Sequence, residues 1–198
     1  MYRTAIFDFG LSDDALISAV DDALAAAAEK GAAPMRYRFT EDPNAEETVH
    51  HWHGADLGDQ LRIVEDRPMG AAYALAISAE EPKIDAMIEA LTAAFGRRDC
   101  ASVREGLRER LAENPATLMQ LTVCDTLRFQ PESEALLLDL SRSSDRDLRM
   151  AAAQAMGILS WPSLRARLAE MEPAEADPTI RGVIRYALEN PAEDPDRN

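Results

Sequence analysis

A short block of sequence near the C-terminus occurs twice, 32 positions apart, and it constrains the fold more than any other feature. The block Asp145-Arg-Asp-Leu-Arg149 recurs as Asp177-Pro-Thr-Ile-Arg181. At the same distance from each aspartate, Ala155-Met156 recurs as Ala187-Leu188. A repeat of this length is typical of stacked helical hairpins, because one hairpin alone cannot bury its apolar face. The sequence therefore predicts a helical-repeat region with a surface for binding, but it does not identify what is bound.

The repeat extends towards the N-terminus with less regularity. We expect three hairpin units, at residues 100–131, 132–163 and 164–195, of which the first is degenerate. Helical spacing of the apolar residues predicts two helices in each unit. The predicted pairs are 103–112 with 116–127, 134–140 with 146–159, and 164–171 with 179–188.

The repeated polar residues have structural explanations. Asp145 and Asp177 stand where the second helices begin, and an aspartate there accepts hydrogen bonds from free backbone N–H groups. Arg149 and Arg181 follow one turn later, where each can reach the cap aspartate of the adjoining unit, and both are also candidate binding residues. Gly157 marks either a close approach between helices or an early helix end.

Residues 145–159, with the sequence Asp-Arg-Asp-Leu-Arg-Met-Ala-Ala-Ala-Gln-Ala-Met-Gly-Ile-Leu, resemble a HEAT-like repeat. More narrowly, they resemble the short bacterial variety named after phycobilin lyases. The resemblance is good over residues 132–190, weak over 100–131 and absent before. It implies a scaffold used by many binding proteins. Deoxyhypusine hydroxylase-like enzymes on such scaffolds carry His-Glu pairs, whereas the histidines here lie outside the repeats. DNA glycosylases of this architecture need a cationic groove, which an acidic chain disfavours.

The N-terminal half combines strand and helix patterns. Strands are predicted at residues 4–9, 35–39, 48–53, 61–63 and 73–77, and helices at 12–31 and 78–96. The two helices are separated by a run of strands, which favours an antiparallel sheet with both helices on one face. We therefore expect an α+β two-layer sandwich over residues 1–99, followed by an all-α HEAT-like domain over residues 100–198.

Three histidines lie in a four-residue stretch that begins at residue 50. On a strand, His51 and His53 share one face and Trp52 points the opposite way, into the core. Asp56 and Asp59 follow closely, so a metal site is one hypothesis for these four residues. The others are a polar or aromatic interaction surface and an ordinary exposed strand edge. Because nothing in the sequence makes three ligands converge, we predict no metal or other cofactor.

The chain contains two cysteines, Cys100 and Cys124, and both fall in predicted helices. Their spacing matches neither a CxxC motif nor a set of metal ligands. We therefore expect two small side chains, buried or half-buried, that play no chemical role.

The balance of charge is strongly acidic, with a net charge of −15. Residues 1–99 hold 19 acids and 9 bases, a net −10, and the remainder holds 17 acids and 12 bases, a net −5. Nucleic-acid binding depends on cationic contacts to phosphate, so we expect no nucleic-acid partner. No apolar run approaches the roughly 20 residues of a membrane span, and the N-terminus lacks a signal peptide's unbroken apolar run. We therefore expect a cytoplasmic protein that does not bind membranes.

These observations favour a non-enzymatic protein–protein interaction module. An acidic surface suits association with a basic partner, and one such class is the bacterial immunity or inhibitor protein that blocks a basic toxin or enzyme. The alternative is a small-ligand or metal-dependent enzyme with its site in the N-terminal domain, near the histidines.

Overall fold

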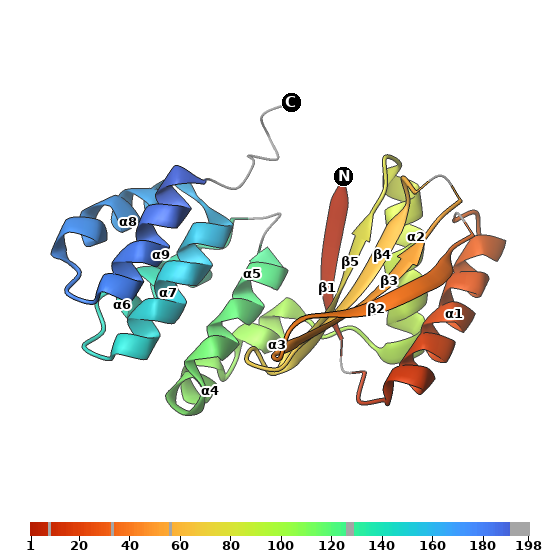
Figure 1. Ribbon diagram of the computed structural model, residues 1–198, viewed down its shortest axis with the longest axis horizontal. Coiled ribbons are helices and arrows are strands. Elements are labelled where there is room, and N and C mark those ends of the chain that lie inside the picture. The colour runs from red at the N-terminus through yellow and green to blue at the C-terminus, as the bar shows by residue number, and fades with distance from the viewer. Residues whose placement is uncertain (8, 33, 56, 126–128, 191–198) are drawn as a thin grey trace. The chain divides into compact units, whose positions relative to one another are not determined.

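The computed structural model describes residues 1–7, 9–32, 34–55, 57–125 and 129–190. The chain divides into two compact units, Met1–Asp99 and Cys100–Asn198. The first contains an antiparallel sheet with two helices, and the second is helical (Figure 1). An α+β region followed by a helical region, as the sequence predicts, is therefore confirmed.

The N-terminal unit is built on a five-stranded sheet in the order β1-β5-β4-β3-β2. All neighbouring strands are antiparallel. The elements in chain order are β1 (Tyr2–Phe7), α1 (Asp13–Glu29), β2 (Arg36–Asn44), β3 (Glu47–His53), β4 (Gln60–Asp66), β5 (Ala71–Ile77) and α2 (Glu81–Phe95). Strand β2 extends five residues beyond its predicted end, and this extension brings polar side chains next to the histidines of β3.

Both helices of this unit pack on the same face of the sheet (Figure 1). Because side chains alternate between the two faces of a strand, every second residue faces the helices. Examples are Trp52 on β3 and Leu61 and Ile63 on β4. These side chains form one buried cluster with the apolar faces of α1 and α2, whose fully or nearly buried members are Leu16, Val20, Leu24, Ile84, Met87, Ile88 and Leu91. The core therefore lies between one sheet face and the two helices.

The C-terminal unit consists of short helices in the first third and longer ones afterwards. Its elements are α3 (Cys100–Arg104), α4 (Leu107–Glu113), the 3₁₀ turn η1 (Pro115–Met119), α5 (Gln120–Asp125), α6 (Pro131–Leu140), α7 (Arg146–Leu159), α8 (Pro162–Ala174) and α9 (Pro178–Glu189). Helix α7 packs against α6, α8, α9 and the η1–α5 segment (Figure 1). Its alanines are fully or nearly buried, and small side chains there let the neighbouring helices approach.

The first hairpin differs from its prediction. The helix expected at 103–112 is interrupted at Gly106, whose φ of +66° is left-handed, so α3 and α4 are separate helices. The helix expected at 116–127 starts with the η1 turn, where the Asn114 side chain accepts a hydrogen bond from the N–H of Ala116. The described part of α5 ends at Asp125, and residues 126–128 lie outside the described residues.

The two cysteines form a disulfide, which corrects the expectation of two inert thiols. Helix α3 packs against α5, and the Cα atoms of Cys100 and Cys124 lie 5.6 Å apart. A separation of 24 residues does not reveal such a pair, because only the packing of the two helices brings the cysteines together. Disulfides persist in oxidising compartments and are rare in the cytosol. The bond therefore does not favour the cytoplasmic location, which stays a prediction.

Candidate functional site

His51 and His53 do lie on one face of β3, as the strand period predicts. Their ring centroids are 6.2 Å apart. The His51 ring stacks on Phe39 of β2 at 4.4 Å, and its Nε2 atom lies 2.9 Å from Oε1 of Glu41. Each of these contacts comes from the neighbouring strand, so the histidines belong to a polar and aromatic strand pair.

The aspartates that follow do not complete a metal site with these histidines. The Asp59 carboxylate is buried and accepts a hydrogen bond of 2.5 Å from Ser78 Oγ and one of 3.4 Å from Lys83 Nζ. It therefore ties the chain just before β4 to the segment that joins β5 to α2 and to the first turn of α2. Asp56 lies outside the described residues.

The surroundings of His53 also disfavour a bound cation. The pKa of His53 is lowered, mainly because burial disfavours the charged imidazole, and further by His51, Arg38 and Arg62. Positive groups that oppose protonation of an imidazole also oppose a metal ion at the same place. The charges around His53 thus give no support to metal binding at this residue.

Arg149 and Arg181 are held inside the C-terminal unit. Arg149 donates to both carboxylate oxygens of Glu175, at 2.9 and 3.2 Å, which lowers the pKa of Glu175. Arg181 donates to the backbone carbonyl of Glu175 at 2.8 Å. The arginine that reaches a neighbouring cap is instead Arg146, whose Nε lies 2.7 Å from Oδ2 of Asp177. The prediction that Arg149 makes that contact is therefore wrong, because Arg149 lies nearer the loop before α9.

The N-cap roles of the two aspartates are as expected. The Asp145 side chain accepts hydrogen bonds from the N–H groups of Asp147 and Leu148. Asp177 accepts the equivalent bonds from Thr179 and Ile180. Both aspartates are therefore used by their own helices.

His50 points to the opposite face of β3 from His51, towards the helices, and it is fully buried at 0% exposure. Its Nδ1 atom lies 2.7 Å from Thr40 Oγ1, which in turn lies 2.7 Å from the hydroxyl of Tyr37. Its Nε2 atom is buried, has no hydrogen-bond partner among the described residues, and lies 3.5 Å from Oε1 of Glu65. A buried imidazole nitrogen without a hydrogen bond is uncommon and calls for an explanation.

Asp13, in the first turn of α1, brings a second carboxylate to this place. One ligand atom from each of Asp13, His50 and Glu65 lies within 4.8 Å of the others. Across the described residues, no other group of three His, Cys, Asp or Glu side chains converges in this way. Strand alternation from Trp52 is the sequence signal that places His50 on the helix side, but the contacts with Asp13 and Glu65 require the tertiary fold.

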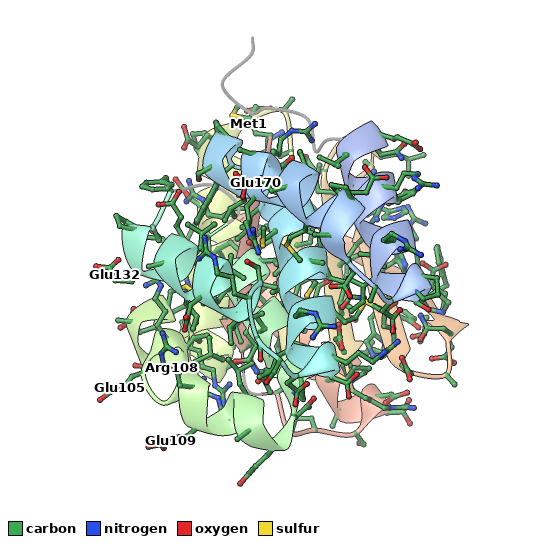
Figure 2. All side chains as sticks on the ribbon, turned by 90° about the vertical axis from the view of Figure 1, so that its left-hand side faces the viewer. Met1, Glu105, Arg108, Glu109, Glu132 and Glu170 are labelled. Carbon is green, nitrogen blue, oxygen red and sulfur yellow. A yellow bond between two sulfur atoms is a disulfide. The ribbon has the colours of Figure 1, made fainter. Side chains whose placement is uncertain are left out.

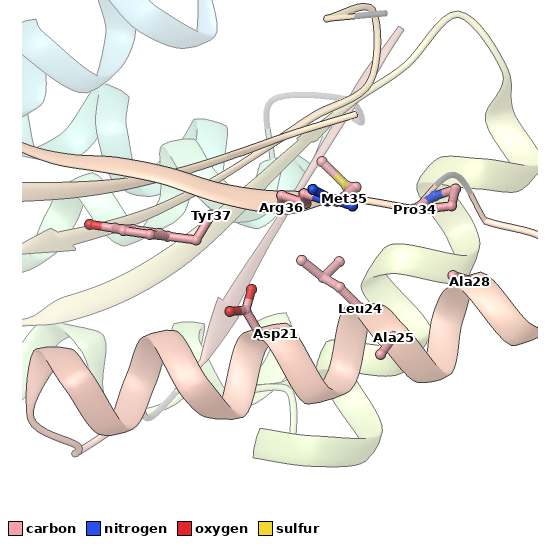
Figure 3. Close-up of a pocket in the computed structure, with 8 residues that line it drawn as sticks. All are labelled: Asp21, Leu24, Ala25, Ala28, Pro34, Met35, Arg36 and Tyr37. Atoms are coloured by element: carbon pink, nitrogen blue, oxygen red, sulfur yellow. The ribbon is translucent and has the colours of Figure 1, made fainter. Parts of the chain in front are cut away.

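Described residues of the N-terminal unit line a cavity of about 550 Å³ between α1 and the start of β2. Figure 3 shows the side chains that line it, of which Asp21 and Arg36 are charged. The Asp21 carboxylate already accepts a hydrogen bond of 2.8 Å from Trp52 Nε1. A further cavity in this unit, of about 360 Å³, includes Glu65 in its wall.

A groove of about 440 Å³ lies in the C-terminal unit, between α3–α4 and α5–α6. Arg104 crosses it to pair with the fully buried Asp125, which also accepts a hydrogen bond of 2.5 Å from Ser133. The remaining lining comprises the apolar side chains of Leu121 and Leu136, and Gly106. At the rim it includes the charged side chains of Arg108, Glu109 and Glu132. Figure 2 shows Glu105, Arg108, Glu109 and Glu132 on the same side of this unit.

No protein-family model, curated protein or solved structure matches this chain. Within the described residues, every helix is too short or too polar to cross a lipid bilayer.

Proposed function

We propose that the protein is a non-enzymatic binding module for a basic protein partner, and that the groove in its C-terminal unit receives a lysine or arginine side chain of that partner. The observation that carries the proposal is that apolar Leu121 and Leu136 line this groove together with Glu109 and Glu132, while its two arginines are already paired with acids. A long basic side chain has two parts that match this lining, an apolar stem and a cationic head.

The arginines of the groove do not make it cationic. Arg104 is paired with Asp125, and Arg108 is paired with Asp139 at 3.2 Å. When the two partner aspartates are counted with the groove, the region contains two arginines and four acids. The acids are Asp125, Asp139, Glu109 and Glu132. The net charge of this region is therefore −2, in keeping with the −15 of the whole chain. Complementary charge speeds association and selects against acidic partners.

For the scaffold that carries the groove, we propose an array of HEAT-like hairpins. Two aspartate caps 32 positions apart make the same hydrogen bonds, which supports a repeated unit. Two ion pairs with the same separation of 31 residues, Arg108–Asp139 and Arg146–Asp177, support stacking of successive units. Arrays of this kind present extended binding surfaces.

The partner class that fits best is a basic toxin or enzyme, which the protein would block as an immunity or inhibitor protein. The test is to purify basic proteins encoded next to its gene and to measure their binding to the immobilised full chain at several salt concentrations. We expect a complex with submicromolar affinity that weakens as salt rises, because exposed charges are screened.

The double variant Glu109→Gln/Glu132→Gln is expected to weaken this complex at least about tenfold, in the range seen when important interface side chains are changed. Glu113→Gln/Glu189→Gln removes the same charge from exposed positions outside the groove lining and is the matched control. If both double variants weaken binding equally, the groove is not the site. If no basic neighbour binds at micromolar concentration, the proposed function is wrong.

A further inference from the structure

We propose that Asp13, His50 and Glu65 form a binding site for a divalent transition-metal ion of the Zn²⁺ class, in the N-terminal unit and independent of the groove. The first reason is the state of His50. Its Nε2 atom is buried and has no hydrogen-bond partner among the described residues. Burial of a polar atom without a partner is unfavourable, and a metal ion would supply the missing partner.

The geometry of the three side chains fits one ion. Metal–ligand distances of about 2.1 Å in a tetrahedral site place the ligand atoms about 3.4 Å from one another. The His50 Nε2 and Glu65 Oε1 atoms are 3.5 Å apart, and the Asp13 oxygen lies within 4.8 Å of both. Asp13 is exposed at the start of α1, so its carboxylate has room to rotate towards the other two.

The second ring nitrogen of His50 is held as in known metal sites. A metal-binding histidine usually donates its other N–H to a neighbouring acceptor, which orients the ring and leaves the second nitrogen free to bind. Here the Nδ1 atom lies 2.7 Å from Thr40 Oγ1, and Tyr37 holds that hydroxyl from the other side. When Nδ1–H donates to Thr40, the lone pair of Nε2 faces the carboxylates.

The charge of the site favours a cation. Two carboxylates and a neutral imidazole carry −2, and among the described residues neither Asp13 nor Glu65 forms an ion pair with an arginine or lysine. This distinguishes the site from the other face of β3, where Arg38 and Arg62 oppose a positive charge. An imidazole ligand favours Zn²⁺ and similar ions, since Ca²⁺ and Mg²⁺ prefer oxygen ligands.

Three protein ligands leave one tetrahedral position for water or another small ligand. Structural zinc sites normally have four protein ligands, whereas three are typical of sites with an open position. Glu65 is also part of the wall of the 360 Å³ cavity, so the site borders a space beside the sheet.

The tag-free full chain is first stripped of metal with a chelator, which is then removed by dialysis. Zn²⁺ is titrated into this protein in the presence of a chromogenic chelator that competes for the ion. We expect one Zn²⁺ per chain with micromolar or tighter affinity. We expect at least about a tenfold loss of affinity when any one ligand is changed, in His50→Gln, Glu65→Gln or Asp13→Asn. Thr40→Val removes only the supporting hydroxyl and should weaken binding by about tenfold. Circular dichroism checks that each variant is folded. Because Asp13 is exposed, Asp13→Asn decides the question even if His50→Gln does not fold.

The matched control is His51→Ala/His53→Ala, which removes two histidines from the opposite face of the same strand and is expected to bind Zn²⁺ like the wild type. Co²⁺ provides a second readout, since its visible absorption reports nitrogen and oxygen ligands directly. The proposal is overturned if the wild type binds no stoichiometric Zn²⁺ at micromolar concentration. It is equally overturned if the control loses binding while Asp13→Asn and Glu65→Gln retain it, or if Ca²⁺ binds in place of Zn²⁺.

Discussion

At the scale of single residues, packing decides why a glycine occupies a given position in the helices of the C-terminal unit. Gly157 lies inside α7, which continues to Leu159, so it does not end the helix. A Cβ atom placed on Gly157 would lie 2.7 Å from the Cβ of Ala187 in α9. Of the two explanations for Gly157, close approach between helices is therefore the correct one.

Gly157→Ala is expected to destabilise the C-terminal unit. Alanine is favoured over glycine in a helix by about 1 kcal/mol, but overpacking of a tight contact costs about 1–3 kcal/mol. Ala187 is short and part of the helix, so its Cβ cannot move aside without moving α9. The measurement is urea denaturation followed by circular dichroism.

Gly182→Ala is the matched control, because Gly182 lies in α9 and a Cβ there meets nothing within 4 Å. It should stabilise the unit by about 0.5–1 kcal/mol through helix propensity alone. If Gly157→Ala stabilises the protein as much as Gly182→Ala does, the close approach of α7 and α9 is not a constraint.

At the scale of elements, the loop before α9 is held by a small network around Glu175. The side chain is buried, pairs with Arg149 of α7, and also accepts a hydrogen bond of 3.0 Å from the N–H of Asp177. These bonds lower the pKa of Glu175, and the pKa of Asp177 is lowered chiefly by the hydrogen bond that its carboxylate accepts from Arg146. The network thus ties α7 to the first turn of α9.

The lowered pKa values predict a loss of stability in acid. A carboxyl group with a lower pKa in the folded state stabilises the fold fully above its unfolded pKa, near 4.5 for Glu175 and 3.8 for Asp177. This contribution is lost as the pH falls through the folded pKa. The free energy of unfolding of the C-terminal unit should therefore decrease steadily from about pH 5 towards pH 3.

Glu175→Gln should be less stable at pH 7 and should show a shallower decline in acid, since it has one fewer group to protonate. Glu170→Gln, which alters an exposed ion pair with Arg167 on α8, is the control and should follow the wild-type curve. Urea denaturation at several pH values, monitored by Trp161 fluorescence in a Trp52→Phe background, measures both. Parallel pH curves for wild type and Glu175→Gln would contradict this role for Glu175.

At the scale of the whole molecule, the described residues form a separate buried core in each of the two compact units. Each core contains one of the two tryptophans, Trp52 in the N-terminal unit and Trp161 in the C-terminal unit. The disulfide Cys100–Cys124 lies entirely within the second unit. Fluorescence of single-tryptophan variants therefore reports each unit by itself.

Cys100→Ser/Cys124→Ser should lower the free energy of unfolding of the C-terminal unit by about 3 kcal/mol, from the chain entropy of a loop with a separation of 24 residues. This is measured by Trp161 fluorescence in a Trp52→Phe background. In a Trp161→Phe background, Trp52 should report an unchanged transition of the N-terminal unit. Equal shifts of both transitions would show that the two units do not unfold independently.

The sequence by itself determined those features that depend on local periodicity. Apolar spacing located most helices and strands, the repeated block located the caps at Asp145 and Asp177, and strand alternation placed His51 and His53 on one face. These features follow from neighbours within one turn or one strand. The HEAT-like nature of the repeats and the protein-binding function stay predictions.

The tertiary structure alone decided which distant groups meet. The pairing of Cys100 with Cys124 depends on helix packing, and the use of Arg146 instead of Arg149 at the Asp177 cap depends on how α7 faces α9. The convergence of Asp13 and Glu65 on His50 joins a helix start with two strands, and no spacing along the chain encodes it. The physical reason is the same in each case, since side-chain direction follows from local geometry but proximity follows from the packing of whole elements.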